Sequence, residues 1–138
     1  MSYQLEAGRE PFRLIDTRED AWYREAAPVP ARDYLALPLM GDEPEPVTAW
    51  VLNATVTNTR GAGHLSVAPD PNTWTDYRKG LQVRPERPGS SSLNWTAGAT
   101  VPNLVQTSGG KGDVIDLWNQ GWEPVDVIVD CLGYYDTK

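Results

Sequence analysis

Apolar and polar residues alternate in short stretches of this chain, and the alternation is clearest between residues 49 and 59. Trp50, Leu52, Ala54 and Val56 occupy every second position there, with polar or β-branched residues between them. A period of two places successive side chains on opposite faces of a β-strand. The segment therefore predicts a strand whose Trp50 face belongs to the core.

The same reasoning predicts eight or nine short strands. Their ranges are 12–18, 34–40, 49–59, 64–68, 81–84, 91–96, 100–107, 114–119 and 125–134. Glycine and proline separate most of them, and no convincing amphipathic helix appears between them. Residues 19–32 and 69–80 are predicted to be long loops.

These elements predict an all-β fold, a single-domain antiparallel β-sandwich of jelly-roll-like type, with a closed barrel as the main rival. Residues 1–12 are expected to form an N-terminal arm and residues 13–138 the sandwich domain. We expect the strand at 49–59 to form a hairpin with 64–68, and the strand at 114–119 to form one with 125–134. Pro102 lacks a backbone donor, which favours an edge, an end or a bulge for its strand.

Composition limits the classes of protein to which this chain can belong. It has 138 residues, a net charge of -7 and 40% hydrophobic residues, so one globular domain is expected. No apolar run approaches the length of a membrane span, and the acidic balance argues against nucleic acid as a partner. The first residues lack the basic and apolar regions of a secretory signal, so we expect a protein made inside a cell.

Four motifs are spread over nearly the whole chain. They are Arg-Leu-Ile-Asp-Thr-Arg at 13–18, Leu-Asn-Ala-Thr-Val-Thr at 52–57, Ser-Leu-Asn-Trp at 92–95 and Asp-Cys-Leu-Gly-Tyr-Tyr at 130–135. Together they resemble a β-rich domain of actinobacterial secreted and cell-surface proteins that is also met in actinophage virion proteins. The resemblance covers about residues 13–135, but this chain has one copy and a tryptophan-rich loop that is longer than expected between Ala68 and Ser90.

The resemblance, with one copy and no export signal, favours a non-enzymatic structural protein of a virion surface. We expect a capsid decoration or minor structural protein of an actinobacterial phage, which docks on the major capsid or other virion proteins through its arm and loops. A trimer is one arrangement that capsid symmetry would favour. The alternative is a carbohydrate- or cell-wall-binding module of a secreted or surface protein.

Candidate catalytic and metal-binding residues are few. His64, Ser66 and Asp70 could be assembled into a triad on paper, but no nucleophile-elbow motif supports one. One histidine and Cys131, which falls in an alternating run and is expected to be a small buried hydrophobe, cannot build a zinc site. The acidic loop at 42–45 lacks the ligand pattern of an EF-hand. We therefore expect no catalytic residue, no metal and no cofactor.

Aromatic residues outside the strands are the candidates for partner or glycan contact, because exposed tryptophan and tyrosine serve both kinds of binding. Trp74 and Tyr77 are expected to be the best exposed pair, with Trp22 and Arg78 as further contacts. The tryptophans in or beside strands are expected to pack, and these are Trp95, Trp118 and Trp122.

Asp16 and Asp130 stand among apolar residues in two of the four motifs. A carboxylate in this position can accept hydrogen bonds from backbone N–H groups or from arginine. We expect both residues to have a structural role in locking strand ends.

Overall fold

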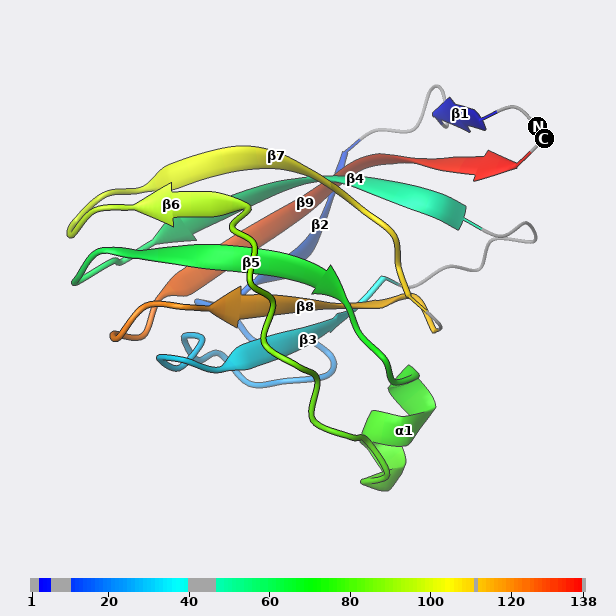
Figure 1. Cartoon of the computed structure of the whole chain (residues 1–138), viewed down its shortest axis with the longest axis horizontal. Helices are drawn as coiled ribbons and strands as arrows, with labels where there is room; N and C mark the ends of the chain where they lie inside the picture. Colours follow the sequence, from blue (N-terminus) through cyan, green and yellow to red (C-terminus); the bar gives the residue numbers. More distant parts are fainter. Residues whose placement is uncertain (1–2, 6–10, 40–46, 111, 138) are drawn as a thin grey trace.

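The computed structural model describes residues 3–5, 11–39, 47–110 and 112–137, which form two antiparallel sheets and one short helix. The five-stranded sheet contains β1 (Tyr3–Leu5), β2 (Phe12–Asp16), β4 (Val47–Thr57), β7 (Val101–Thr107) and β9 (Asp126–Thr137). The four-stranded sheet contains β3 (Tyr34–Pro38), β5 (Gly63–Pro69), β6 (Leu93–Trp95) and β8 (Val114–Asn119). The helix α1 is Trp74–Lys79 (Figure 1).

The strand order is that of a jelly roll. The five-stranded sheet has the order β1-β9-β4-β7, with β2 also beside β9, and the four-stranded sheet has the order β3-β8-β5-β6. The pairs β2·β9, β3·β8, β4·β7 and β5·β6 are nested, as if one long antiparallel hairpin had been rolled up. This nesting is the double Greek key of jelly rolls, and it confirms the predicted all-β sandwich.

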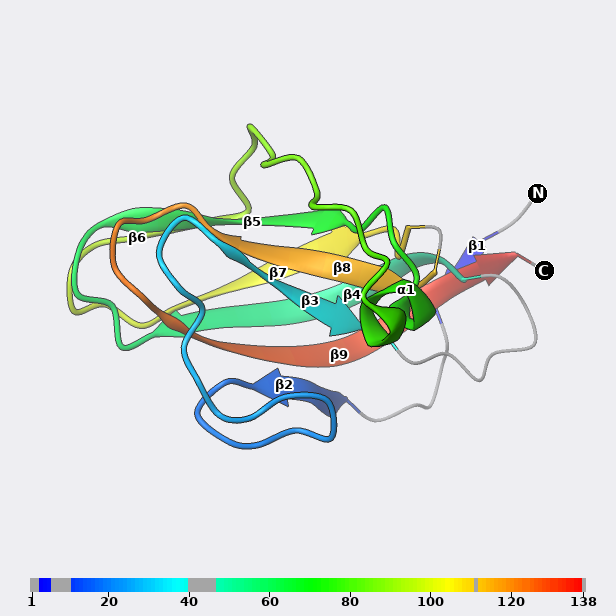
Figure 2. The same ribbon diagram turned by 90° about the horizontal axis from the view of Figure 1, so that it is seen from below.

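The core lies between the two sheets, which Figure 2 shows as two layers. Trp50, Leu52, Ala54 and Val56 of β4 are all buried, with Trp50 only 2% exposed. Each large side chain removed from water in this way contributes roughly 1.5–3 kcal/mol. The alternating residues of the last strand face the same core, including the buried Cys131. The predicted interior stripe is therefore confirmed.

Both predicted hairpins are wrong. β4 pairs with β7 and β9, whereas β5 pairs with β6 and β8, so the chain crosses from one sheet to the other after residue 57. β8 and β9 also belong to different sheets. The physical reason is that each of these strands turns an apolar face to the core, and strands that stand in opposite layers cover each other's apolar faces.

The predicted loop at 69–80 contains a helix. The Thr73 side chain accepts a hydrogen bond from the backbone N–H of Asp76, and the Asp76 carboxylate accepts one from the backbone N–H of Thr73. This capping box satisfies two backbone donors at the start of α1. Gly80 ends the helix in the left-handed conformation, with φ of 71°.

The predicted strand at 81–84 is absent, because a side chain satisfies the backbone there. The Asn72 side chain accepts from the backbone N–H of Val83 at 2.9 Å and donates to the Val83 carbonyl at 2.8 Å. Asn72 thus acts as a substitute strand partner for one residue, and residues 81–84 form no ladder.

The predictions for the edges of the sheets are confirmed in part. Pro102 lies in β7, the outer strand of the five-stranded sheet, as predicted. Phe12 begins β2, in agreement with the predicted strand at 12–18, and Tyr3–Leu5 forms β1 against the end of β9. The rest of the arm and the acidic loop at 42–45 lie outside the described residues.

All six residues of β8 are buried, so both of its faces are covered. Ile115 and Leu117 belong to the apolar core, while the alternate residues Val114, Asp116 and Trp118 face the other way. The cover on this outer side includes α1 and residues 81–87, whose side chains contact Trp118 and Tyr34. The candidate site lies beneath this cover.

Candidate functional site

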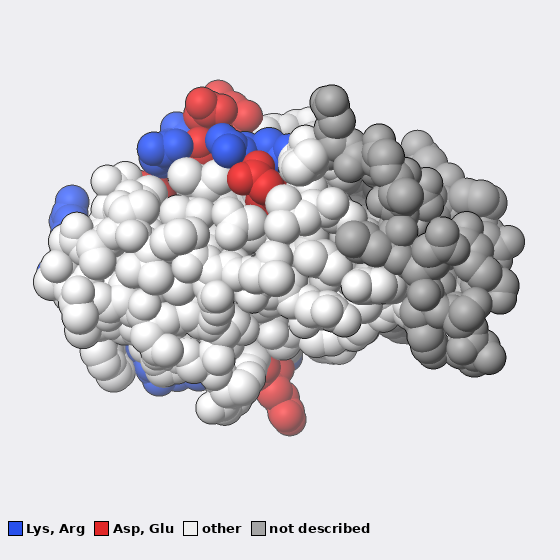
Figure 3. All heavy atoms as spheres, turned by 90° about the horizontal axis from the view of Figure 1, so that it is seen from above, with Lys and Arg blue, Asp and Glu red and all other residues white. Residues whose placement is uncertain are grey.

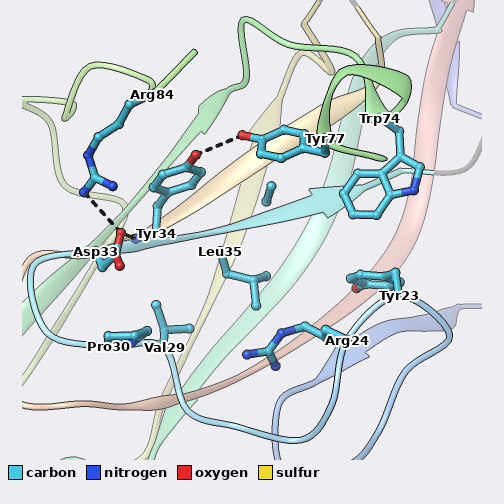
Figure 4. Close-up of a pocket in the computed structure, with 11 residues that line it drawn as sticks. Tyr23, Arg24, Val29, Pro30, Asp33, Tyr34, Leu35, Trp74, Tyr77 and Arg84 are labelled. Atoms are coloured by element: carbon cyan, nitrogen blue, oxygen red, sulfur yellow. Dashed lines mark hydrogen bonds and ion pairs between the residues drawn. The ribbon is translucent and has the colours of Figure 1, made fainter. Parts of the chain in front are cut away.

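A cavity of about 390 Å³ opens between the 17–33 loop, the edge strand β3, α1 and Arg84 (Figure 4). This volume is within the range of small-ligand sites. Four aromatic side chains line it, from Tyr23, Tyr34, Trp74 and Tyr77. Its charged side chains are Arg24, Asp33 and Arg84.

The aromatic side chains form one continuous cluster although they come from distant parts of the chain. The ring of Trp74 lies 5.5 Å from that of Tyr23, 5.7 Å from Tyr77 and 6.0 Å from Trp22, measured between centroids. Trp22 and Tyr23 are 4.9 Å apart. Tilted and edge-to-face contacts of this kind stabilise the packing beyond simple burial, so the 17–33 loop and α1 are held together.

Three of the four predicted contact residues therefore meet. Trp22 is exposed beside the cavity, at 66%, while Trp74 and Tyr77 line it. The expectation that Trp74 and Tyr77 form an exposed pair is wrong, because both are half-buried against their neighbours. Arg78 is exposed on α1, donates to the Thr75 hydroxyl and does not line the cavity.

One side of the cavity is fixed by a stack of rings and arginines. Tyr34 lies over Trp118 with centroids 4.9 Å apart, and the guanidinium of Arg84 lies 5.5 Å from each ring. Arg84 also donates to Asp33 at 3.1 Å. The charge of Arg84 is thus balanced within the site by Asp33.

Behind Tyr77 lies a buried network of hydroxyls and carboxylates. The Tyr77 hydroxyl donates to Asp70 at 2.5 Å, so Tyr34, whose hydroxyl is 3.1 Å away, donates to Tyr77. Burial and the bond to Asp70 raise the pKa of Tyr77 well above its ordinary value, and burial also raises the pKa of Tyr34. Both tyrosines are therefore neutral hydrogen-bond donors at neutral pH.

Asp116 adjoins Asp70 and is 1% exposed. No donor from another described residue reaches its two oxygens. Burial, followed by the neighbouring Asp70 carboxylate, raises the pKa of Asp116 to about 9. At neutral pH Asp116 is therefore protonated.

Three donors in the cavity walls have no acceptor among the described residues. They are the Tyr23 hydroxyl, Nη1 of Arg24 and Nε1 of Trp74, and all three atoms are buried. Burial raises the pKa of Tyr23 to about 12, so its hydroxyl keeps its proton. A buried donor without a partner costs about 1–3 kcal/mol, and native proteins satisfy most such groups.

The residues considered for catalysis do not converge within the described part of the chain. The Ser66 hydroxyl donates to the Ser90 carbonyl, and Asp70 accepts from Tyr77 and Asn72. No hydrogen bond joins either residue to His64 there. No group of three histidine, cysteine or acidic side chains is arranged to hold a metal ion in the same ranges.

Asp16 and Asp130 both accept hydrogen bonds from arginine at strand positions. Asp16 receives Nε and Nη2 of Arg18 at 2.9 and 2.8 Å and the Arg18 backbone N–H at 3.1 Å. These bonds lower its pKa below the ordinary value. Asp130 receives Nε of Arg13 at 2.8 Å, which ties β9 to β2.

Trp95 and Trp118 are buried as predicted, but Trp122 is not. It is 76% exposed, with the Arg32 guanidinium 4.6 Å from its ring. The expectation that Trp122 packs is wrong because it stands in the short connection between β8 and β9, where the chain passes from one sheet to the other at the surface.

Sequence reasoning missed Tyr23, Arg24, Tyr34 and Arg84 as cavity residues. The Thr73-x-x-Asp76 capping box, followed by Gly80, is a signal that would have placed Trp74 and Tyr77 on a helix. No local sequence pattern predicts that the 17–33 loop contacts this helix.

Comparisons with known proteins add no relative: no family model, no curated protein and no solved structure matches this chain. In the described residues no helix is long and apolar enough to cross a membrane.

Proposed function

We propose that this chain is a non-enzymatic structural protein of a virion surface, a capsid decoration protein of an actinobacterial phage that docks on other virion proteins. The observation that carries the proposal is a large uncharged face. Residues 88–110 contain no charged residue, although charged residues make up 22% of the chain. Outside its grey atoms, Figure 3 shows a broad surface without charges and with Lys, Arg, Asp and Glu gathered at its rims.

Two outer strands meet on this side of the molecule. β6 is the last strand of the four-stranded sheet and β7 the last of the five-stranded sheet, and the two are in contact. Leu104 on β7 is 61% exposed, and Pro102 and Asn103 are also exposed. We call this surface the β6–β7 face.

The physical argument concerns charge. The centres of protein interfaces are depleted in charged residues, because a buried charge loses its hydration. A chain of net charge -7 repels other acidic proteins over most of its surface. The β6–β7 face is where a protein partner meets the smallest electrostatic and desolvation cost.

Two further observations support a virion role. Jelly rolls recur in viral capsid proteins and in lectins, so the fold is compatible with this role. The four sequence motifs resemble a domain that is also met in actinophage virion proteins. The face adds a docking surface to the expected arm and loops.

The proposal is tested on particles released by lysis from an actinobacterial host that carries the gene. We expect the protein to co-sediment with intact particles through a density gradient and to be labelled on their outer surface by a specific antibody. Purified particles that lack the protein would overturn the proposal.

The aromatic cavity favours a second candidate function, a carbohydrate- or cell-wall-binding module of a secreted or surface protein. Aromatic rings stack on the C–H faces of sugars while polar side chains bind the hydroxyls. Trp74 and Tyr77 line the cavity and Trp22 stands exposed beside it. A saturable change in tryptophan fluorescence with cell-wall saccharides would support this candidate, and no response up to millimolar sugar would remove it.

A further inference from the structure

The cavity beside α1 offers several donors, and its lining carboxylate, Asp33, is already paired with Arg84. Asp33 accepts from Arg84 and from the Tyr34 backbone N–H. In contrast, the Tyr23 hydroxyl and Nη1 of Arg24 donate to nothing among the described residues. Nη2 of Arg24 donates to the Ala27 carbonyl, which holds the side chain without neutralising it.

The two residues come from one turn, and both line the cavity. Figure 4 shows the Arg24 guanidinium below Leu35 and the Tyr23 side chain above that of Arg24. A backbone bridge between Ala21 and Arg24 fixes this turn, with hydrogen bonds of 2.9 and 3.4 Å. The donors are therefore positioned by the fold of the loop.

The charge count shows what the cavity lacks. Arg84 is balanced by Asp33, which leaves Arg24 as the unbalanced charge among the lining residues. A guanidinium that forms no ion pair with a described residue favours an anionic ligand, and it binds a carboxylate through two parallel hydrogen bonds. The tyrosine hydroxyl supplies a third donor.

From these observations we propose that the cavity binds a carboxylated sugar. The carboxylate contacts Arg24 and Tyr23, and the sugar ring lies against Trp74 and Tyr77. The inference rests on the second candidate function and names its ligand class. A neutral sugar would leave the Arg24 charge without a counterion, whereas a carboxylate without a ring would leave the aromatic walls uncovered.

The test compares three probes by isothermal titration calorimetry with the whole protein: methyl glucuronide, methyl glucoside and acetate. The first two share a ring and differ in a carboxylate against a hydroxymethyl group. We expect the glucuronide to bind at least tenfold more tightly than the glucoside and acetate, because hydrogen bonds to charged groups contribute about 1.5–3 kcal/mol.

Three variants assign the effect to the cavity. Tyr23→Phe removes only a hydroxyl that bonds to no described acceptor, so the fold is kept and glucuronide affinity falls about three- to tenfold. Arg24→Gln lowers it by about 10- to 100-fold and leaves the glucoside affinity unchanged. Arg78→Gln is the matched control, since it removes an exposed arginine of α1 outside the cavity, and it changes neither affinity.

The outcomes separate the inference from the function on which it rests. Equal affinity for glucuronide and glucoside overturns the carboxylate preference and keeps a glycan-binding module. Binding of acetate as tight as that of glucuronide overturns the sugar part. Failure of both sugars overturns the inference and the second candidate function together. If Arg24→Gln fails to fold, Tyr23→Phe with unchanged glucuronide affinity overturns the proposed contact.

Discussion

The cavity beside α1 and the β6–β7 face differ in shape, in charge and in the side chains that form them. The cavity is concave, aromatic and rich in arginine, with buried donors that no described residue satisfies. The β6–β7 face has no charges, exposes Leu104 and ends in two sheet edges. A hollow with unsatisfied donors fits a small polar ligand, while a broad uncharged surface fits another protein.

The difference also lies in what supports each surface. The β6–β7 face stands directly on sheet edges, so its shape follows from the jelly roll itself. The cavity depends on contacts between loop side chains and on a buried pair of acids, Asp70 and Asp116. Changes at the cavity are therefore expected to affect stability, and changes at the face to affect association.

The largest expected effect comes from pH and concerns only the cavity side. The pKa of Asp116 is raised to about 9, so between about pH 4 and pH 9 the folded state holds a proton that the unfolded state has lost. Stability therefore falls as pH rises through this window and levels off above it. We expect urea unfolding to show a loss of at least ~2 kcal/mol between pH 5 and pH 9.

Asp116→Asn removes this titration and should flatten the dependence on pH. Glu86→Gln, which changes an exposed carboxylate, is the control and should leave the slope unchanged. A wild-type protein whose unfolding free energy does not fall across this window would contradict the proposed protonation of Asp116.

Trp74→Ala is expected to have the next largest effect. It removes the ring that joins Trp22, Tyr23 and Tyr77, so the 17–33 loop loses its contact with α1. We expect destabilisation by roughly 2 kcal/mol, less than for a fully buried tryptophan, and loss of any sugar binding. If Trp74→Ala still binds particles, the cavity lies outside the protein interface, whereas lost binding would place the cavity in that interface.

Tyr77→Phe is a smaller change in the same region. It keeps the ring in the cavity wall but removes the hydroxyl that donates to Asp70 and accepts from Tyr34. We expect destabilisation by about 1–2 kcal/mol, because a buried carboxylate oxygen loses its donor. Thermal unfolding measures this loss, and an unchanged midpoint would show that the network does not support the cavity.

Leu104→Glu should have the smallest effect on stability, within about 0.5 kcal/mol for an exposed position. It places a negative charge in the middle of the β6–β7 face, so co-sedimentation with particles should be lost. Leu81→Glu makes the same replacement at a leucine that is 68% exposed and follows α1 by two residues. Figure 1 shows α1 apart from β6 and β7, so this variant should leave co-sedimentation intact. Equal behaviour of the two variants would remove the face from the docking surface.

Much of the sheet framework could be predicted, but little of the site. Trp50 and the apolar residues at alternate positions after it predict a buried strand, because apolar residues recur there with a period of two. Trp74 and Tyr77 were recognised as binding candidates from composition and loop position. Arg84 could not be, because its place over Tyr34 and Trp118 depends on a segment that Asn72 anchors from eleven residues away in the sequence.

The amino-acid sequence alone indicates most of the strands, the apolar face of the core strands and the stretch without charges, since these properties are largely local. Three features appear only in the folded structure: β4 and β5 stand in opposite sheets, Trp22 contacts Trp74, and Asp116 lies beside Asp70. Strand pairing and loop docking are chosen by the burial that all segments achieve together. No single segment carries that information.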